Sequence, residues 1–563
     1  MSRPEVYHSP MFRFGWLTVV SCLLLNTATA VDWTPGLAVL NTNTLLERVK
    51  VLASDDFEGR APGTPGEEKT VHWMADQFKA LDLEPGGSDG TYFDPVPMVG
   101  VSSTTQAAFN HKGSFQPLNY PQDFVAWSPL TEPTVAVTNS DLVFVGYGVV
   151  APEYDWDDYK GVNVRGKTLV MLVGDPPIPD PVDPSKLDPK MFKGKAMTYY
   201  GRWTYKYEIA AAKGAAAAII VHETGPAGYP WFVVINSWSR ERFDLEDAPG
   251  PQVRVASWIS QDRARALFGS AGLTYELAKA MAIDRKFHPL NLGSTVDFAV
   301  TNQVRHVRSR NVAGVLPGSD PARRDEWLVV TAHWDHLGRD PKLTGDQIFN
   351  GAEDNATGSA GLLGLAQAFK AGPPPARSIL FLSVTGEEQG LLGAKYYATH
   401  PTHPLRQTLA NLNMDGLNTW GRTHSVAVVG LGNSTLDDEV VRFAKQQGRE
   451  VVSEPMPEKG TFYRSDHFEF AKVGVPALYM KSALDYLGRP TNWGQLKTDE
   501  FTDHDYHKVS DEVKPDWDLS GAIEDLGLLY QVGWTVANQP EWPVWNPGSE
   551  FKARREAMAP PPR

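Results

Sequence analysis

Cysteine is almost missing from this sequence: Cys22 is the only one among 563 residues. A disulfide needs two cysteines, so no bridge within the chain can support its fold. A surplus of positive charge is missing as well, and the net charge of −14 argues against a surface that binds nucleic acid. The G-x-S-x-G run of many serine hydrolases has no match, because the nearest stretch, ATGSAG, has the wrong spacing.

Long apolar runs are scarce, and the N-terminus holds the clearest one. Arg3 and Arg13 give a positive start, the run Phe14–Leu25 is apolar but too short for a stable membrane span, and Ala28–Ala30 forms an A-x-A-like cleavage site. This pattern predicts a signal peptide over residues 1–30 and export to the periplasm or the extracellular space. No later run is long enough to cross a membrane, so the mature chain is expected to have no transmembrane helix.

A second interpretation of the N-terminus is a lipid anchor on Cys22. The residues Val19–Cys22 loosely resemble the cleavage box of bacterial lipoproteins. Three leucines follow Cys22, however, where a polar tether is expected. Lipoprotein anchoring is therefore kept as the minor alternative.

The most informative stretch lies between residues 328 and 415. Three apolar runs of strand length each end in side chains that can bind a metal ion. LVVTAHWD contains His333, SILFLSVTGEE ends in Glu387 and Glu388, and LANLNMD ends in Asp415. Ligands of open α/β sheets bind beyond the carboxyl ends of the strands, so these side chains are expected to meet at one edge of a sheet.

One imidazole together with several carboxylates suits a divalent cation such as zinc. The carboxylates carry more negative charge than one zinc ion needs, so a pair of ions that share a bridging carboxylate fits better. Asp354 lies on the short Gly/Asn-rich loop NGAEDNATG and fits the bridge. Two metal ions roughly 3.5–4 Å apart can hold a bridging water molecule. Of the adjacent residues Glu387 and Glu388, one can then bind a metal ion while the other acts as general base.

These motifs together resemble a known family. HWDHLG, GAEDNATG, TGEEQGLLGA and NMDG are similar to the motifs of the co-catalytic di-zinc aminopeptidases, metallopeptidases related to glutamate carboxypeptidase and the transferrin receptor. The family's pattern ends in a Tyr-His pair before a short polar run and an aspartate. DYHKVSDE supplies this ending with Tyr506, His507 and Asp511.

Carried over position by position, the resemblance implies a centre with two Zn²⁺ ions. His333 and Asp415 would bind one zinc ion, Glu388 and His507 would bind the other, and Asp354 would bridge them. The polar residues beside these positions are then expected to serve the reaction rather than the metal.

Three residues receive catalytic roles from the same resemblance. Glu387 would be the general base, Asp335 would orient the imidazole of His333, and Tyr506 would donate a hydrogen bond to the developing oxyanion. The implied function is an exported aminopeptidase that removes the N-terminal residue of peptides through a metal-bridging water molecule and a glutamate general base.

The alternation of strands and helices predicts an α/β fold with a mostly parallel central sheet flanked by helices. Near residue 123 the sequence changes to short β-rich runs, which resemble an inserted protease-associated domain. The expected organisation is a signal peptide (1–30), a first peptidase segment (31–122), the insertion (123–302), the catalytic peptidase segment (303–540) and a Pro-rich tail (541–563).

Several local predictions accompany this organisation. Within the insertion, WFVVINSW and PQVRVASWIS are expected to be strands, and KYEIAAAKGAAAAIIVHE a helix followed by a buried strand. Arg60 and Glu67 are expected on a solvated loop. His336 and the pair Asp466 and His467 are expected near the substrate rather than as metal ligands.

Other functions remain open from the sequence. A carboxypeptidase or dipeptidase on the same scaffold would need an arginine cluster for the substrate carboxylate; Arg464 and Arg489 are candidates, but no cluster is evident in the sequence. A catalytically silent binding protein, like the transferrin receptor, should lack ligands, and none is missing here. The expected partner is a peptide substrate, and the oligomeric state is left open.

Overall fold

The computed structural model describes residues 31–248 and 250–558. The predicted signal peptide, its alternative lipid-anchor site Cys22 and the last five residues lie outside the described residues. No helix in the described part of the chain is both long and apolar enough to cross a membrane.

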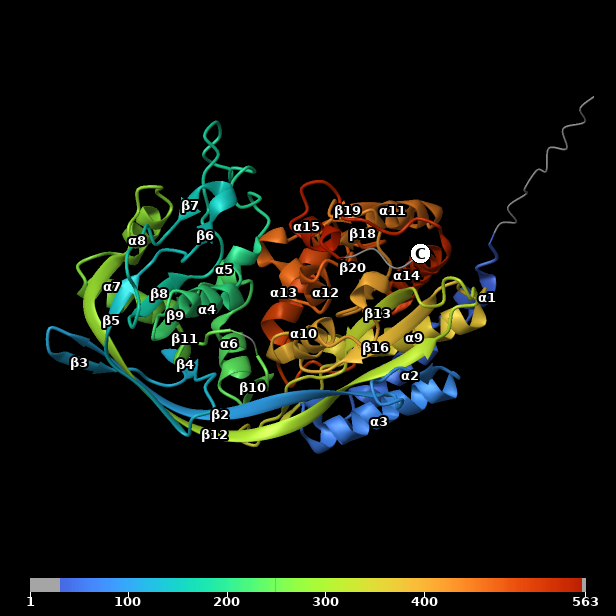
Figure 1. The fold of residues 1–563 in the computed structure, drawn as a ribbon, viewed down its shortest axis with the longest axis horizontal. Coiled ribbons are helices and arrows are strands. Elements are labelled where there is room, and N and C mark those ends of the chain that lie inside the picture. Colours follow the sequence, from blue (N-terminus) through green and yellow to red (C-terminus); the bar gives the residue numbers. More distant parts are fainter. Residues whose placement is uncertain (1–30, 249, 559–563) are drawn as a thin grey trace, which may run out of the picture. The chain divides into compact units, whose positions relative to one another are not determined.

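One extended mixed sheet organises the described chain (Figure 1). Its strands follow in the order β19 (Glu450–Ser453), β18 (Ser425–Val428), β20 (Ala477–Ser482), β17 (Thr408–Asn413), β13 (Trp327–His333), β16 (Ser378–Val384), β12 (Leu290–Leu316), β5 (Thr134–Phe144), β8 (Thr168–Leu172), β9 (Ala217–Val221), β11 (Val255–Ile259) and β4 (Phe124–Trp127). The central strands β20, β17, β13 and β16 are mutually parallel, and so are β5, β8, β9 and β11. This arrangement confirms the predicted mostly parallel α/β fold.

Helices cover the part of the sheet around β17, β13 and β16. The helices are α2 (Thr42–Leu52), α3 (Pro65–Ala80), α9 (Thr357–Ala371), α11 (Leu436–Gln446) and α14 (Ser520–Asn538). The side chain of Asn41 accepts a hydrogen bond from the backbone N–H of Thr44 and so caps α2. Apolar residues of α9 and α14, such as Leu362 and Leu529, are buried in one core with the strands.

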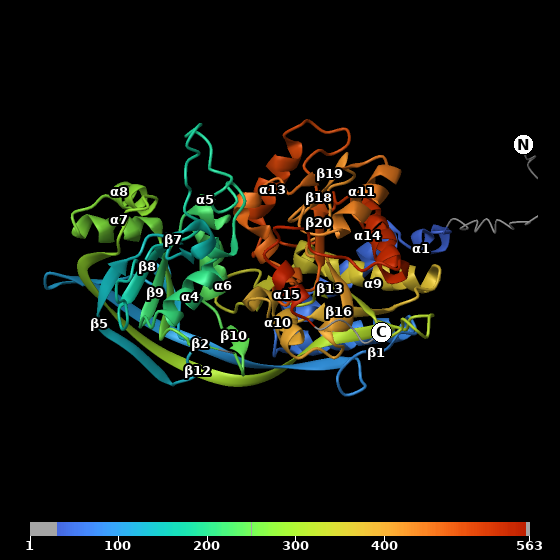
Figure 2. The same cartoon turned by 45° about the horizontal axis from the view of Figure 1, so that its top comes forward.

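Two long antiparallel strands join the two halves of the sheet. β2 (Phe93–His111) pairs with β12 along 19 consecutive residue pairs, from Val312 opposite Phe93 to Ser294 opposite His111. The strands run side by side in both Figure 1 and Figure 2. The C-terminal end of β12, residues 312–316, pairs with β16, and its N-terminal part, residues 290–301, pairs with β5. The segment that contains the predicted insertion therefore shares a sheet with the peptidase segment.

One predicted strand of the insertion is wrong. WFVVINSW forms the helix α6 (Trp231–Trp238), which follows Pro230 and buries Val233, Val234 and Trp238. An apolar run of eight residues does not distinguish a buried strand from a short helix by its pattern alone. The other two predictions for this region are confirmed by α4 (Trp203–Ala212), β9 and β11.

The expectation that Arg60 and Glu67 lie on a solvated loop is also wrong. Each side chain is only 1% exposed. The Arg60 guanidinium donates hydrogen bonds to the carbonyl oxygens of Trp334 at 2.8 Å and Gly351 at 2.9 Å. The Gly/Pro-rich loop around Arg60 folds beneath the ends of the central strands, which its polar sequence did not reveal.

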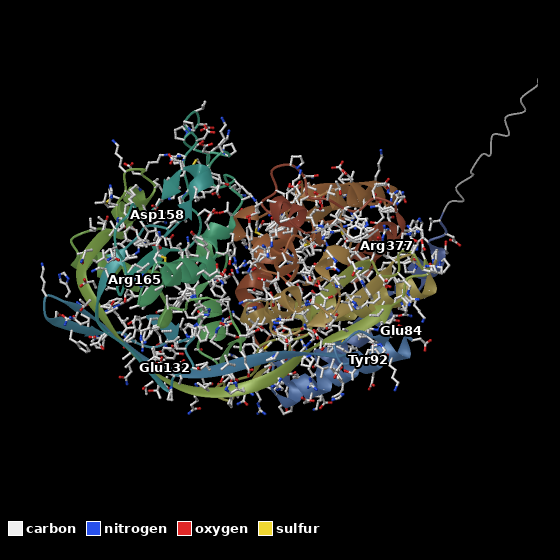
Figure 3. All side chains as sticks on the ribbon, in the orientation of Figure 1. Glu84, Tyr92, Glu132, Asp158, Arg165 and Arg377 are labelled. Atoms are coloured by element: carbon white, nitrogen blue, oxygen red, sulfur yellow. The ribbon has the colours of Figure 1, made fainter. Side chains whose placement is uncertain are left out.

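A second buried arginine shows how the fold usually satisfies such a charge. Arg377, labelled in Figure 3, lies just before β16 and is 2% exposed. Its guanidinium forms an ion pair with Glu326 and donates hydrogen bonds to the carbonyl oxygens of Val536 and Gln539. The positive charge is thus matched entirely by groups of the chain itself.

Candidate metal centre

Three neighbouring strands end at the candidate site. β13 lies between β16 and β17, parallel to both, with Thr331 opposite Leu382 on one side and Asn413 on the other. Because the strands are parallel and in register, their carboxyl ends lie at the same edge. His333 is the last residue of β13, and Glu387 and Asp415 follow shortly after the ends of β16 and β17.

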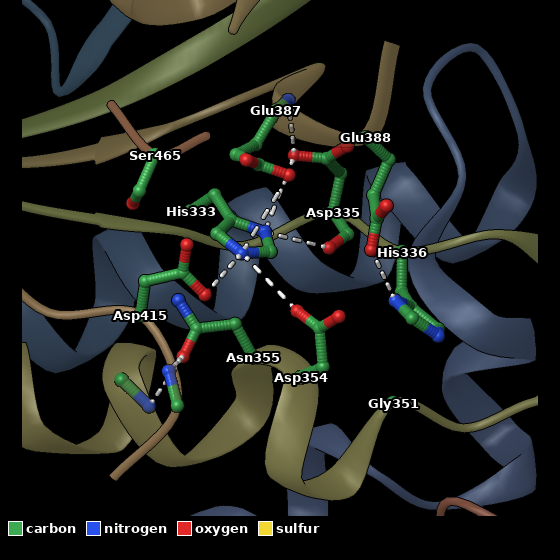
Figure 4. Close-up of polar contacts among 12 residues, drawn as sticks. His333, Asp335, His336, Gly351, Asp354, Asn355, Glu387, Glu388, Asp415 and Ser465 are labelled. Carbon is green, nitrogen blue, oxygen red and sulfur yellow. Dashed lines mark hydrogen bonds and ion pairs between the residues drawn. The ribbon is translucent and has the colours of Figure 1, made fainter. Parts of the chain in front are cut away.

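Asp354 lies between two imidazoles. Its Oδ1 is 3.4 Å from Nε2 of His333, and its Oδ2 is 3.4 Å from Nε2 of His507. Oδ1 of Asp415 lies 3.4 Å from the same nitrogen of His333. Figure 4 shows His333 surrounded by the carboxylates of Asp354, Asp415 and Glu387. The structure thus brings together His333 and His507, which are 174 positions apart in the chain.

A shaped loop holds Asp354 in this position. Gly351 has φ +54°, and a Cβ atom there would lie 2.3 Å from the carbonyl oxygen of Asp354, so only glycine fits. The carboxylate of Asp511 accepts hydrogen bonds from the backbone N–H groups of Glu353 at 2.9 Å and Asp354 at 3.1 Å. The peptide bond between Asp354 and Asn355 is cis. The backbone around Asp354 is therefore fixed from both sides.

His507 is held by groups from two distant segments. Its Nε2 lies 3.0 Å from Oε2 of Glu388. Its Nδ1 lies 3.1 Å from the Ser237 hydroxyl, and its carbonyl oxygen accepts a 3.1 Å hydrogen bond from the Asn236 side chain. Ser237 and Asn236 belong to α6, so the predicted insertion helps to orient this imidazole. No local pattern predicts this contact, because the partners are 270 positions apart.

His336 is a further imidazole at the site. Its Nδ1 lies 2.7 Å from Oε1 of Glu388. Its Nε2 is buried and has no hydrogen-bond partner among the described residues. The HWDH spacing pointed to His336 as a residue lining the site, but its proximity to Glu388 makes it a candidate ligand beside His507.

Asp335 and Glu387 also lie close to the imidazole of His333. Nδ1 of His333 is 3.1 Å from the carbonyl oxygen of Asp335 and 3.8 Å from its carboxylate. That carboxylate accepts a 3.1 Å hydrogen bond from the backbone N–H of Glu387. The Glu387 carboxylate lies 3.9 Å from Nε2 of His333. The backbone of Asp335 therefore contacts the imidazole more closely than its side chain does.

The two adjacent glutamates differ in their proton affinity. Burial raises the pKa of Glu387 well above its usual value, and the nearby Asp415 and Glu388 carboxylates add to the rise. Burial also acts to raise the pKa of Glu388, but His507 and His336 lower it to about 2. Glu387 can thus accept a proton while Glu388 stays ionised, which separates a base from a ligand.

Tyr506 borders two pockets that meet at the site. One is lined by Glu388, His507 and residues of the inserted region, and the other by Asp354, Asp415 and apolar side chains; Glu387 and Tyr506 line both. The ring of Tyr506 lies 4.0 Å from that of His507, centroid to centroid. Burial raises the pKa of its hydroxyl well above the usual value, so Tyr506 stays a hydrogen-bond donor.

The donor set fits divalent cations. His333, Asp354 and Asp415 each offer a ligand atom within 4.8 Å of the others, and so do His336, Asp354 and Glu388. Donors of a tetrahedral zinc ion at 2.0–2.2 Å are separated by about 3.3 Å, close to the distances at Asp354. Asp354 belongs to both groups, as a bridging carboxylate would. Asp466 and His467 are buried nearby without hydrogen-bond partners among the described side chains, and Ser465 lines the second pocket.

Comparison with known proteins gives a family match for the segment that holds this site. The model of peptidase family M28 matches residues 311–530, a range that holds every predicted metal ligand and Glu387. Aminopeptidase YwaD of Bacillus subtilis is 27% identical over 220 residues, which make up 38% of this chain and 41% of YwaD. A protein of Pyricularia oryzae named "Probable zinc metalloprotease" is 30% identical over 265 residues, 44% of this chain and 50% of that protein.

The chain spans about half the length of the curated relatives that it matches. Among solved structures, the aminopeptidase from Aneurinibacillus sp. strain AM-1 has a similar fold, with a TM-score of 0.51, 17% identity and coverage of 92% of this chain and 98% of that one. The segment 311–530 thus matches peptidase family M28 in sequence, and most of the chain has the fold of this solved structure.

Proposed function

We propose that this chain is an exported di-zinc aminopeptidase. The observation that carries the proposal is the position of the Asp354 carboxylate, with one oxygen near His333 and the other near His507. A carboxylate between two imidazoles, each with a second carboxylate of its own, is the arrangement that two zinc ions with one shared ligand require. The family match and the names of its relatives support a metallopeptidase.

The residues that would hold the ions follow from the contacts. His333 and Asp415 would complete one zinc site, Glu388 and His507 the other, and Asp354 would contribute to both. Zinc bound there would supply Lewis-acid polarisation of the scissile carbonyl and would make a water molecule more acidic. His336 stands next to Glu388 and competes with His507 as the nitrogen ligand of the second site.

The side chains around the metal ligands carry the remaining chemistry. Glu387 takes the proton of the attacking water and passes it to the leaving amine, a role that its raised pKa favours. Tyr506 donates a hydrogen bond to the oxygen on which negative charge develops. Asp335 holds the backbone of Glu387 through a 3.1 Å hydrogen bond and thereby positions the base.

The second pocket favours cleavage at the N-terminus of a peptide. Beside the proposed metal ligands and three basic side chains, its lining carries the carboxyl groups of Glu353 and Glu387, which can accept hydrogen bonds from a free ammonium group. The lining also includes apolar side chains such as Leu417 and Phe501, which can receive the side chain of the N-terminal residue. The aminopeptidase assignment therefore rests on these two carboxyl groups.

The activity is tested with leucine p-nitroanilide, N-acetyl-leucine p-nitroanilide and a C-terminal reporter peptide. Hydrolysis of the free anilide only, its loss in a chelator and its recovery on addition of zinc are expected. Activity confined to the N-acetylated substrate would contradict the aminopeptidase proposal. Export is tested separately by N-terminal sequencing of the protein recovered outside the cytoplasm, with Val31 expected as the first residue.

A further inference from the structure

A pocket rich in arginine opens onto the metal centre. We name it the guanidinium pocket. Its lining includes Arg202, Arg242, Arg464, Trp203, Tyr229 and Trp238. Glu388 and His507 lie in the same lining, so a molecule in this pocket also reaches the metal ligands. The arginines are far apart in the chain, which explains why the sequence showed no cluster.

Arg202 is a buried charge without a counter-charge. It precedes α4 and its side chain is 8% exposed. No hydrogen bond or ion pair joins its guanidinium to any described residue, and its Nε is buried without a partner. The nearest aromatic contact is weak, with Cζ 5.9 Å from the centroid of the Trp203 ring. Burial, and then the positive charge of Arg464, lower the pKa of Arg202 to about 10.

The other two guanidiniums are matched only by carbonyl oxygens and rings. Arg464 donates a 3.3 Å hydrogen bond to the carbonyl of Ala227 and lies 4.8 Å from the Tyr229 ring. Arg242 donates a 3.3 Å hydrogen bond to the carbonyl of Ser237, and its Nε is buried without a partner. None of the three arginines forms an ion pair with a described carboxylate.

Of the four acidic residues that line the pocket, Glu387 is the proposed base, and the other three are already engaged. Glu208 accepts a 2.8 Å hydrogen bond from the Tyr199 hydroxyl, and Glu469 forms a 3.2 Å ion pair with Lys472. Glu388 contacts His336 and His507. A buried charge without a partner is costly, and two neighbouring charges of like sign increase the cost. The missing negative charge must therefore come from a ligand.

We propose that the guanidinium pocket binds a carboxylate of the peptide substrate. The inference rests on the proposed aminopeptidase function, which supplies peptides as ligands, and it narrows the substrate class to short peptides or to peptides with an acidic residue after the scissile bond. The N-terminal residue of the peptide enters the second pocket, which Asp354 and Asp415 line. The scissile bond then lies beside Glu387 and Tyr506, and the part of the peptide that leaves enters the guanidinium pocket. A planar guanidinium binds a carboxylate through two parallel hydrogen bonds, which favours this ligand over a neutral one.

The test compares substrates that differ only in one charge. Leu-Ala is compared with Leu-Ala amide for a terminal carboxylate, and Leu-Asp amide with Leu-Asn amide for a side-chain carboxylate. In at least one pair, the charged peptide is expected to show a kcat/KM about 10- to 100-fold higher, the range of a charge-assisted hydrogen bond. The variant Arg202→Met should bring this ratio close to one.

A matched control variant is Arg489→Met. Arg489 is exposed and packs with Cζ 4.8 Å from the Trp493 ring, and it does not line the guanidinium pocket. This variant should keep the wild-type ratio. If the ratio persists in Arg202→Met, or if both substrate pairs react at equal rates in the wild type, the inference is overturned.

A binding measurement separates this inference from the proposed function. Tryptophan fluorescence of the zinc-loaded full chain with Glu387→Gln follows binding of Leu-Ala and Leu-Ala amide without turnover. Tighter binding of the charged peptide, lost in the double variant with Arg202→Met, supports the carboxylate site even if the wild type cleaves no peptide. Equal binding of both peptides, together with anilide hydrolysis, would overturn the carboxylate site and leave the aminopeptidase standing.

Discussion

The two sides of the site use buried charge in opposite ways. On the side built by residues 311–530, His333, Asp354 and Glu388 each lie within 3.4 Å of an oppositely charged or hydrogen-bonding group. Arg202, which belongs to the predicted insertion, has no such group among the described residues, and it shares its pocket with Arg464 of the segment 311–530. The first three side chains thus contact one another or their neighbours in the chain, whereas Arg202 would be matched by the proposed ligand.

The same contrast separates Arg202 from Arg377. Both guanidiniums are buried, but Arg377 pairs with Glu326 and two backbone carbonyls, whereas Arg202 faces a pocket and the charge of Arg464. Arg377 therefore stabilises the fold, and Arg202 should serve binding at some cost to the fold.

The largest effect is expected for Glu387→Gln. The amide cannot take up the proton of water, so kcat should fall. The expected decrease is about three orders of magnitude or more, as for the loss of a general base. Zinc content, measured by atomic absorption, should stay at the wild-type level. Retained turnover would remove Glu387 from the role of base.

The next effect distinguishes the two imidazoles near Glu388. His507→Ala should lower the zinc content from two ions per chain to about one, because His507 contacts both Glu388 and Asp354. His336→Ala should retain two ions and weaken their binding only moderately. The opposite pattern would assign His336 as the ligand and His507 as the outer residue.

Stability measurements test the two arginines directly. Arg377→Met should lower the free energy of unfolding by about 3 kcal/mol, because the change leaves Glu326 and buried carbonyls without their partner. Arg202→Met removes an unmatched charge and should leave that free energy unchanged within about 0.5 kcal/mol or raise it. Urea unfolding of the zinc-loaded chain gives both values. A large loss in Arg202→Met would show that this guanidinium is structural.

The smallest effect is expected for the contact between the Ser237 hydroxyl and the His507 imidazole. Ser237→Ala removes the hydroxyl 3.1 Å from Nδ1 and should weaken zinc binding about tenfold, as for other outer partners of metal-ligating histidines. Ser239→Ala is the matched control, since that hydroxyl follows the same helix, donates to the carbonyl of Ile235 and forms no hydrogen bond with His507. Competition with a fluorescent chelator measures both affinities, and equal values would leave Ser237 without this role.

The sequence predicted the parts of the site that are encoded locally. His333, Glu387 and Asp415 each follow an apolar run, and because parallel strands end at one edge, their meeting could be foreseen before the structure. The fold class followed from the same alternation of strands and helices. These predictions depend only on short-range pattern and on the geometry of parallel sheets.

The rest depends on contacts that no local pattern encodes. Ser237 reaches His507 because α6 is a helix, and its apolar sequence favoured a strand. Arg60 is buried because its loop passes beneath the strand ends, where four backbone carbonyl oxygens accept its hydrogen bonds. Arg202 and Arg464 converge from segments 262 positions apart, the difference of 464 and 202. Their proximity is visible only in three dimensions.

The contact between α6 and His507 has a consequence for anyone trimming the chain. A minimal catalytic version without residues 123–302 would retain every group expected to bind zinc, yet one imidazole would lose its outer support and the leaving-group side would lose its wall. The segment that the sequence marks as an insertion therefore forms part of the proposed site.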